Sequence, residues 1–219
     1  MTEAARRGEI VTGALELERL GLNHGSAGNL SLRFGEAVLV TPSGVPARDL
    51  RPEMVALMPL ADETGAFEGP LPPSSEWRFH LDVYRARPDV NAVVHMHSTY
   101  ATTLATLRRP IPAVHYMIAA FGGPSVPCVG YASYGTPELS RLVVEGLKDR
   151  DGVLLANHGA IVVGADMRRA LWRAVELEAL AQVYYLGSMA GAPVVLPDDE
   201  IWRTVERFRS YGPRDTAQG

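Results

Sequence analysis

The sequence contains very little of two reactive residue types, with one cysteine, Cys128, and one lysine, Lys148, among 219 residues. A single cysteine builds no disulfide framework, so a reducing cytoplasm is the expected compartment. Nothing near Cys128 in the sequence would lower the pKa of its thiol, and we interpret it as a small buried hydrophobic residue. Lys148 falls on the face of an expected helix, where nothing marks it as a nucleophile.

Long hydrophobic runs and an excess of charge are also missing. The chain has no apolar stretch of membrane-spanning length, and no apolar segment follows the first seven residues, so neither a membrane span nor a signal peptide is expected. The net charge of −4 gives no basic surface for nucleic acid or for an anionic membrane. A small phosphorylated ligand is still compatible with this charge, because backbone amides and hydroxyl groups bind phosphate.

Hydrophobic periodicity predicts helices and strands that interleave along the whole chain. We therefore expect one α/β domain with a mixed sheet over residues 1–219, with a flexible tail after about residue 212. The helices are expected at 3–20, from Ser74 or Ser75 to about 87, at 99–107, 136–148 and 167–189, and from about 198 to before Tyr211. The strands are expected at 30–34, 37–41, 54–58, 92–97, 113–117, 126–130, 152–156 and 160–163.

Three short motifs contain the ligand set of a catalytic zinc site. His95 and His97 lie two apart in an apolar run, and in a strand that spacing points both side chains to one face. His158, between two further apolar runs, can supply a third imidazole, and Glu76 can supply a carboxylate. A catalytic zinc takes three protein ligands and keeps a position for water or substrate. The combination favours a metal-dependent enzyme.

Each of these residues also has a plain structural interpretation. Two strand histidines can be hydrogen-bonded core residues, and His158 can be a turn residue beside Gly159. Glu76, in the first turn of a helix, can complement the helix dipole. His80, one turn further along, is interpreted as a packing residue, while His24 and His115 have possible substrate roles.

A set of small polar residues suggests a phosphate pocket. They fall in expected turns or helix starts, where N–H groups point outward, and for any single one a capping or turn role is the simpler interpretation. The set comprises Ser26, Asn29, Ser43, Gly44, Ser74 and Ser75. No nucleotide-binding glycine motif appears in a strand–helix context.

In combination and order, these motifs resemble the zinc-dependent class II aldolase family, which includes L-fuculose-1-phosphate aldolases and L-ribulose-5-phosphate 4-epimerases. The resemblance covers about residues 5–213 and is strongest toward the fuculose-phosphate aldolases. It is carried by the segments 25–31, 41–44, 73–77, 95–97, 111–120, 134–136, 157–159 and 208–212. Serine replaces the frequent threonine at positions 26 and 43, which keeps the hydroxyl group.

The resemblance implies an α/β/α three-layer fold around a mixed, largely antiparallel sheet. It also implies a homotetramer with active sites between subunits and one Zn²⁺ per subunit. His95, His97 and His158 would bind the zinc, with Glu76 as a displaceable fourth ligand and catalytic base. Ser26, Asn29, Ser43, Gly44, Ser74 and Ser75 would bind the substrate phosphate. Tyr116 from a neighbouring subunit would donate a proton, and Tyr211 would close the aldehyde side.

The activity implied is cleavage of a ketose 1-phosphate, with L-fuculose 1-phosphate giving dihydroxyacetone phosphate and L-lactaldehyde. The alternatives are other reactions of the family, namely 4-epimerisation, cleavage of a related ketose phosphate, dehydration of methylthioribulose phosphate and decarboxylation of a sugar acid. No Asp or Glu occurs between residues 100 and 137, which argues against the epimerase. A non-catalytic adducin-like module is disfavoured because all four metal-ligand candidates are present.

Overall fold

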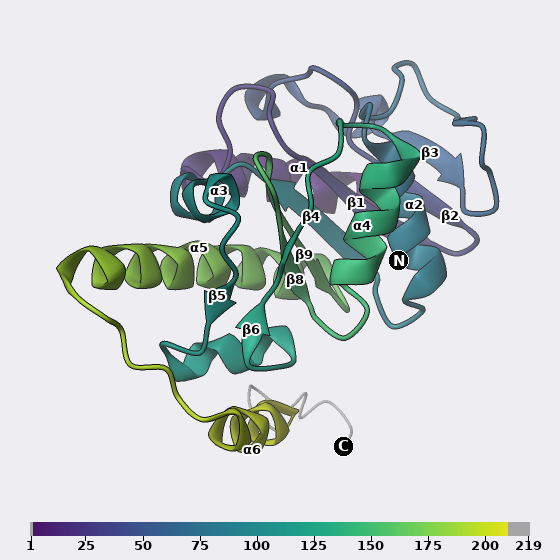
Figure 1. Ribbon diagram of the computed structural model, residues 1–219. Helices are drawn as coiled ribbons and strands as arrows, with labels where there is room; N and C mark the ends of the chain where they lie inside the picture. The colour runs from purple at the N-terminus through teal and green to yellow at the C-terminus, as the bar shows by residue number, and fades with distance from the viewer. Residues whose placement is uncertain (1, 210–219) are drawn as a thin grey trace, which may run out of the picture.

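The computed structural model describes residues 2–209, in which a seven-stranded sheet lies between two layers of helices (Figure 1). The strand order is β3-β2-β1-β4-β9-β8-β7, and only β7 and β8 pair in parallel. The strands are β1 (Asn29–Phe34), β2 (Ala37–Val40), β3 (Ala56–Pro59), β4 (Ala92–Met96), β7 (Cys128–Val129), β8 (Gly152–Leu155) and β9 (Gly159–Gly164). The expected three-layer, largely antiparallel fold is confirmed.

The helices divide between the two faces of the sheet. The long helix α5 packs on β4 and β9 with α1 and α3 beside it, while α2 and α4 pack together on the opposite face. The helices are α1 (Glu3–Arg19), α2 (Trp77–Ala86), α3 (Thr99–Thr106), α4 (Pro137–Gly146), α5 (Met167–Ala190) and α6 (Asp198–Arg209). In the part of the chain described, no helix is long and apolar enough to cross a membrane.

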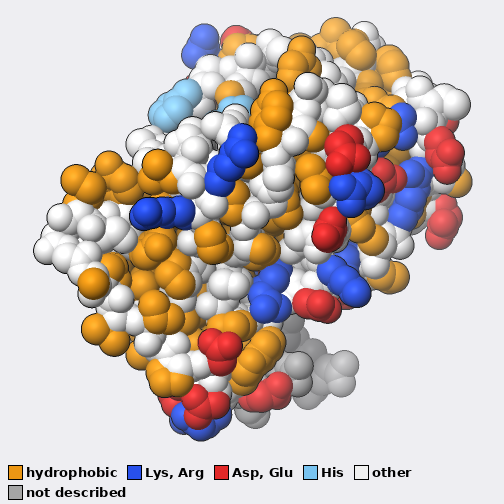
Figure 2. Space-filling view, in the orientation of Figure 1, with side chains coloured by type: hydrophobic (Ala, Val, Ile, Leu, Met, Phe, Trp, Pro, Cys, Tyr) orange, Lys and Arg blue, Asp and Glu red, His pale blue; other side chains and the backbone are white. Residues whose placement is uncertain are grey.

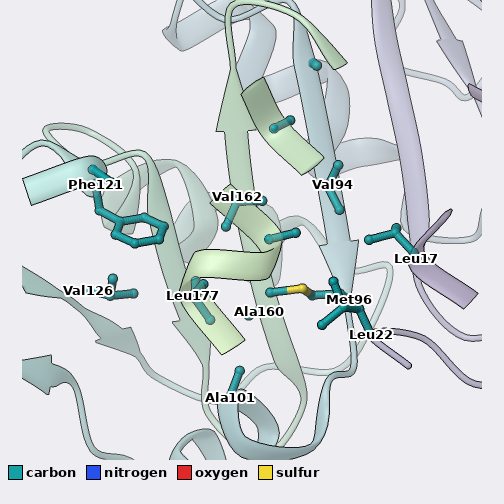
Figure 3. Packing of buried hydrophobic residues seen from close by; sticks show 14 of the residues in the cluster. Leu17, Leu22, Val94, Met96, Ala101, Phe121, Val126, Ala160, Val162 and Leu177 are labelled. Atoms are coloured by element: carbon teal, nitrogen blue, oxygen red, sulfur yellow. The ribbon is translucent and has the colours of Figure 1, made fainter. Parts of the chain in front are cut away.

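Strand alternation separates two hydrophobic cores. Leu30, Val94 and Met96 face the α1/α3/α5 layer, where Figure 3 shows Val94 and Met96 among the packed side chains of the larger core. Val93, the neighbour of Val94, faces the α2/α4 layer instead. His95 also faces this layer, where its ring lies 5.6 Å from the ring of Phe79. The period of two thus buries a histidine against α2.

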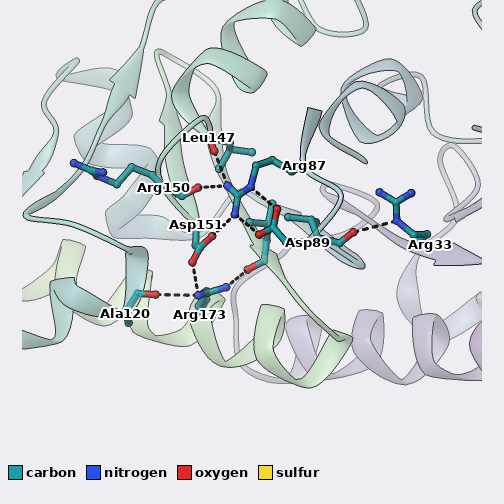
Figure 4. Close-up of polar contacts among 10 residues, drawn as sticks. Arg33, Arg87, Asp89, Ala120, Leu147, Arg150, Asp151 and Arg173 are labelled. Carbon is teal, nitrogen blue, oxygen red and sulfur yellow. Dashed lines mark hydrogen bonds and ion pairs between the residues drawn. The ribbon is translucent and has the colours of Figure 1, made fainter. Parts of the chain in front are cut away.

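A network of ion pairs and hydrogen bonds links three segments at the end of the sheet opposite the histidines (Figure 4). The Arg87 guanidinium donates to Asp89 and to Asp151 at 2.7–2.9 Å, and Asp151 also accepts from Arg173 on α5. Arg173 donates further to the carbonyl oxygens of Ala120 and Val163. These bonds join the segment after α2, the start of β8 and α5.

The prediction of a strand at 113–117 is wrong. Only the pair β5 (Ile111–Pro112) and β6 (Ser125–Val126) forms a ladder here, and a 3-10 helix, η3 (Tyr116–Phe121), follows. The ring nitrogen Nδ1 of His115 accepts from the Met117 amide at 3.3 Å and caps this helix. A local side-chain cap thus starts a helical turn where the sequence predicts a strand.

The prediction that Ser74 or Ser75 caps the second helix is also wrong, because Glu76 occupies the cap position and α2 begins at Trp77. Short 3-10 helices, η1 (Ala47–Asp49) and η2 (Pro52–Met54), precede β3. The expected tail after residue 212 lies outside the described residues.

Candidate active site

Three histidines converge where β4 ends. His95 is fully buried, its Nδ1 donates to the Ala160 carbonyl at 3.0 Å, and that bond fixes the proton on Nδ1. Its Nε2 lies 3.0 Å from Nε2 of His97. One ring nitrogen of each of His95, His97 and His158 lies within 4.8 Å of the others. The spacing that predicted a shared face for His95 and His97 is therefore realised.

His158 reaches this point from the tight turn between β8 and β9. Asn157 adopts a left-handed backbone with φ of 55°, which asparagine tolerates better than most residues. Gly159 follows, and a Cβ atom there would lie 2.5 Å from the Met96 carbonyl oxygen and 2.7 Å from Cδ2 of His97. Glycine is thus required at position 159 because another strand and an imidazole ring pass directly over it.

Glu76 turns into the histidine cluster instead of capping its helix. It makes no side-chain cap bond, and its carboxylate oxygens lie 3.2 Å from Nε2 of His95 and 3.4 Å from Nε2 of His158. Burial by itself would raise the pKa of Glu76, but His95, His158 and the Asn29 amide together lower this pKa to about 2. The carboxylate is therefore ionised at neutral pH.

The donor set fits a divalent cation. Burial lowers the pKa values of His97 and His158 to about 4, so both rings are neutral at pH 7. Among the described residues, Oε1 of Glu76 is a buried oxygen without a hydrogen-bond partner. Three imidazoles and one carboxylate with an unpaired oxygen are ligands that zinc accepts.

A cavity of about 350 Å³ opens beside these ligands and brings the predicted phosphate residues together. Glu76, His97 and His158 line one part of it. The other polar lining residues include Ser26, Asn29, Ser43, Gly44, Ser74 and Ser75. No Lys or Arg is among the lining residues described, so an anion here would be held by hydroxyl groups, backbone amides and the cation.

Two of these polar residues are already engaged inside the protein. The Asn29 amide nitrogen donates to Ser74 Oγ at 3.0 Å and to Glu76 Oε2 at 2.9 Å. Ser74 Oγ also accepts from the Glu76 amide at 3.3 Å, which leaves its hydroxyl proton for a ligand in the cavity. The Asn29 side chain thus supports the carboxylate.

Sequence reasoning did not assign site roles to Tyr131 and Tyr134. Both line the cavity, and their side chains are 59% and 70% exposed. Gly135 holds their loop against the site, because a Cβ atom at this position would lie 2.7 Å from the Ser75 carbonyl oxygen. The only signal in the sequence is the Tyr-Gly-Thr segment, which contributes to the resemblance but gives no position in space.

The remaining predicted residues lie elsewhere. Tyr116 starts η3, is 51% exposed and does not line the cavity of its own chain. Tyr211 falls outside the described residues. Lys148 follows α4 and is exposed away from the cavity, so the site contains no lysine nucleophile among its described lining residues. On the face shown in Figure 2, imidazole atoms reach the surface near the top.

Comparison with known proteins decides the family. Residues 8–185 match the family model described as class II aldolase and adducin N-terminal domain. The chain belongs to the class II aldolase family. It is 47% identical over 207 residues to an L-fuculose phosphate aldolase of Escherichia coli O6:H1, an alignment that covers 94% of this chain and 95% of the relative. It is an aldolase, and therefore a carbon–carbon lyase.

A second relative has a different substrate in its name. A 5-methylthioribulose-1-phosphate/5-deoxyribulose-1-phosphate aldolase of Rhodospirillum rubrum is 46% identical over 214 residues, covering 98% of this chain and 95% of the relative. Among solved structures, an L-fuculose 1-phosphate aldolase superposes with a TM-score of 0.91 at 37% identity, covering 95% of this chain and 98% of that one. These similarities extend over nearly the whole aldolase chain described here.

Proposed function

We propose that this aldolase cleaves L-fuculose 1-phosphate to dihydroxyacetone phosphate and L-lactaldehyde. The observation that carries the proposal is a single cavity lined by two of the three clustered histidines, an ionised carboxylate and a ring of serine hydroxyl groups. These features fit metal-assisted cleavage of a phosphorylated ketose, and related enzymes named above have ketose 1-phosphates in their names.

The proposed cofactor is one zinc ion per chain, with His95, His97 and His158 as its ligands and Glu76 as a displaceable fourth. When bound, zinc supplies a Lewis acid that polarises the substrate carbonyl and stabilises negative charge on its oxygen. In the condensation direction, Glu76 abstracts the proton from the carbon next to that carbonyl. Its position between His95 and His158, and its unpaired Oε1, support this role.

The phosphate is proposed to lie against Ser26, Asn29, Ser43, Gly44, Ser74 and Ser75, all of which line the cavity. Ser26, Ser43 and Ser75 are exposed at the cavity, and Gly44 has φ of 72°, which allows close approach of its backbone to a ligand. Phosphate anchoring fixes the reacting carbons relative to Glu76.

A homotetramer with shared active sites is part of the proposal. Tyr116 would protonate the aldehyde oxygen from a neighbouring subunit, and Tyr211 would close the aldehyde side. Two observations support subunit contacts. Tyr116 is exposed and does not line the cavity of its own chain. Apolar side chains also gather over the C-terminal end of α5 and the segment after it (Figure 2). The exposed residues there include Val183, Leu186, Met189, Val194 and Val195. Light scattering in solution would test for four times the 23.7 kDa chain mass.

The second candidate function is cleavage of 5-deoxyribulose 1-phosphate or 5-methylthioribulose 1-phosphate. The relative from Rhodospirillum rubrum supports it, because its identity of 46% is nearly that of the fuculose enzyme. Both candidates share the bond cleaved and the phosphate end and differ at the aldehyde side.

A cytoplasmic location is also proposed, since the single thiol, Cys128, is half-buried and unpaired.

The deciding experiment is release of dihydroxyacetone phosphate from the three ketose 1-phosphates by zinc-loaded and by chelator-treated protein. Zinc-dependent release with the highest kcat/KM for L-fuculose 1-phosphate is the expected result. A higher kcat/KM for either 5-substituted ribulose phosphate would select the second candidate. No release from any of them by protein of verified zinc content would reject the proposed reaction.

A further inference from the structure

A chain of hydrogen bonds runs from the cavity into the core between β1 and α2. Its members, in order from the core to the cavity, are Tyr84, Ser31, His80, Asn29 and Glu76. Every contact lies between 2.5 and 2.9 Å, and Ser31 and His80 have no exposed surface. Such a buried polar chain is costly unless each group has a partner, so its geometry is tightly specified.

The carboxylate fixes the direction of the bonds nearest the cavity. Ionised Glu76 can only accept a hydrogen bond. The Asn29 atom that lies 2.9 Å from Oε2 is therefore the amide nitrogen Nδ2. Oδ1 of Asn29 then faces Nε2 of His80 at 2.5 Å. Because Oδ1 can only accept, His80 carries a proton on Nε2 and donates it.

The core side of His80 is consistent with the same tautomer. Its Nδ1 has no proton and accepts from the Ser31 hydroxyl at 2.7 Å, while Ser31 Oγ accepts from the Tyr84 hydroxyl at 2.8 Å. Burial lowers the pKa of His80 to about 3, so the ring stays neutral over the range in which an enzyme works. Each hydrogen of the chain thus has one assigned acceptor.

We propose that His80 is a positioning residue for Glu76, acting through the Asn29 side chain. The Nε2–H group of His80 holds the Asn29 amide in the one orientation that directs an N–H donor at the carboxylate. A flipped Asn29 amide would place its oxygen against the Glu76 carboxylate and its N–H groups against the N–H of His80. The first contact would join two acceptors and the second two donors, and both would be repulsive. The inference rests on the proposed function, in which Glu76 transfers the proton.

Two substitutions separate the two sides of the ring. His80→Gln places an amide donor near the position of Nε2 and keeps the bond to Asn29. His80→Asn places its amide near the position of Nδ1, keeps the bond to Ser31 and loses the bond to Asn29. We expect kcat within about threefold of wild type for His80→Gln and about 10- to 100-fold lower for His80→Asn, with KM changed less than about threefold in both.

The control is Tyr84→Phe, which removes a hydroxyl from the same buried chain on the core side of His80. It should lower the melting temperature and leave kcat within about twofold of wild type. Zinc content is measured for every variant, so that loss of metal is separated from loss of positioning. Equal losses of kcat in His80→Gln and His80→Asn, at equal zinc content, would overturn the proposal.

A measurement that needs no activity tests the tautomer directly. Nitrogen-15 spectra of the metal-free wild-type protein, with the His80 signals assigned by their loss in His80→Gln, should show a neutral ring protonated on Nε2 from pH 5.5 to 8.5. A proton on Nδ1, or a charged ring, overturns the proposal whatever the kinetics of the variants. If the wild type cleaves none of the sugar phosphates yet shows the Nε2–H ring, the proposed function fails and the positioning geometry stands.

Discussion

The backbone N–H of His97 donates to Oδ1 of Asn23 at 2.9 Å, which ties the loop after α1 to the end of β4. Asn23 is buried, and a Cβ atom at Gly28 would lie 2.2 Å from its Nδ2, so the loop folds closely around this amide. The contact orients a proposed metal ligand through its main chain. Residues that orient ligands typically contribute 10- to 100-fold to metal affinity.

Asn23→Ala is therefore expected to weaken zinc binding by about 10-fold. Competition with a chromophoric chelator measures the change. The matched control is Asn91→Ala, which removes a side-chain bond to the Ala165 carbonyl at the opposite end of β4 and should leave the zinc affinity unchanged. Equal affinities of Asn23→Ala and wild type would show that the contact does not position His97.

Gly159→Ala should displace the His97 ring, because the new methyl group would lie within 2.7 Å of both Cδ2 of that ring and the Met96 carbonyl oxygen. We expect zinc affinity to fall by at least about 10-fold and the melting temperature to fall with it. Zinc titration and calorimetry measure the two effects.

Gly8→Ala, in α1, is the matched control. A Cβ atom there meets nothing within 4 Å, so alanine should raise stability by about 0.5–1 kcal/mol through its helix propensity. If both alanine variants bound zinc as the wild type does, close packing at position 159 would not govern the site.

Glu76→Gln should retain most of the zinc and lose most of the turnover. The three imidazoles remain, whereas an amide cannot accept the proton, so a fall in kcat of about 10²- to 10⁴-fold is expected. Exchange of deuterium into dihydroxyacetone phosphate isolates this step from bond cleavage. Glu138→Gln, on the surface of α4, should keep wild-type exchange. Wild-type exchange by Glu76→Gln would exclude Glu76 as the base.

The sequence predicts best those parts of the site that depend on local spacing. His95 and His97 share a face because they lie two apart in a strand, and Gly159 allows the close approach of Met96 and His97 because glycine has no side chain. Tyr131 and Tyr134 join the cavity only because Gly135 packs on the Ser75 backbone, a contact between segments sixty residues apart. Long-range contacts of this kind leave no periodic signal.

The same limit explains the errors. Ser75 and Ser74 are good capping residues, but α2 begins at Trp77, and the Glu76 carboxylate at the cap position contacts Asn29 and His95 instead of the helix amides. His80 has the spacing of a helix-packing residue, and it does pack, but its hydrogen bonds with Ser31 and Asn29 come from a strand that is distant in sequence. The roles of Glu76 and His80 thus depend on tertiary contacts, which helix propensity and residue spacing do not predict.

Asp151→Asn should destabilise the fold without touching the cavity. Asp151 accepts from Arg87 and Arg173, and burial already lowers the pKa of Arg173 to about 10. Removing the carboxylate leaves a largely buried guanidinium unpaired, at a cost of about 2–3 kcal/mol after allowing for partial exposure. The melting temperature should fall by about 5–10 °C.

Calorimetry at neutral pH measures this change, and the matched control is Asp149→Asn, at an exposed position two residues away. The kcat of Asp151→Asn at 25 °C should stay within about twofold of wild type. A melting temperature equal to that of the control would show that the network contributes no stability.

The stability of the metal-free protein should fall as the pH falls below 6.5, in part because of His80. The pKa of His80 is about 3 in the folded protein and 6.5 in the reference state, so between these values the unfolded chain binds a proton that the folded protein cannot. The wild type thus loses about 2 kcal/mol from this residue between pH 8 and pH 5. His80→Gln lacks this loss.

Urea unfolding of chelator-treated proteins at pH 8, 6.5 and 5 measures the difference. The free energy of unfolding of the wild type minus that of His80→Gln should be largest at pH 8. At pH 5 this difference should be smaller by about 2 kcal/mol. His24→Gln, at an exposed loop position, should follow the wild type at all three values. A constant difference between wild type and His80→Gln across this range would mean that His80 is protonated equally in both states, which contradicts a neutral, buried donor to Asn29.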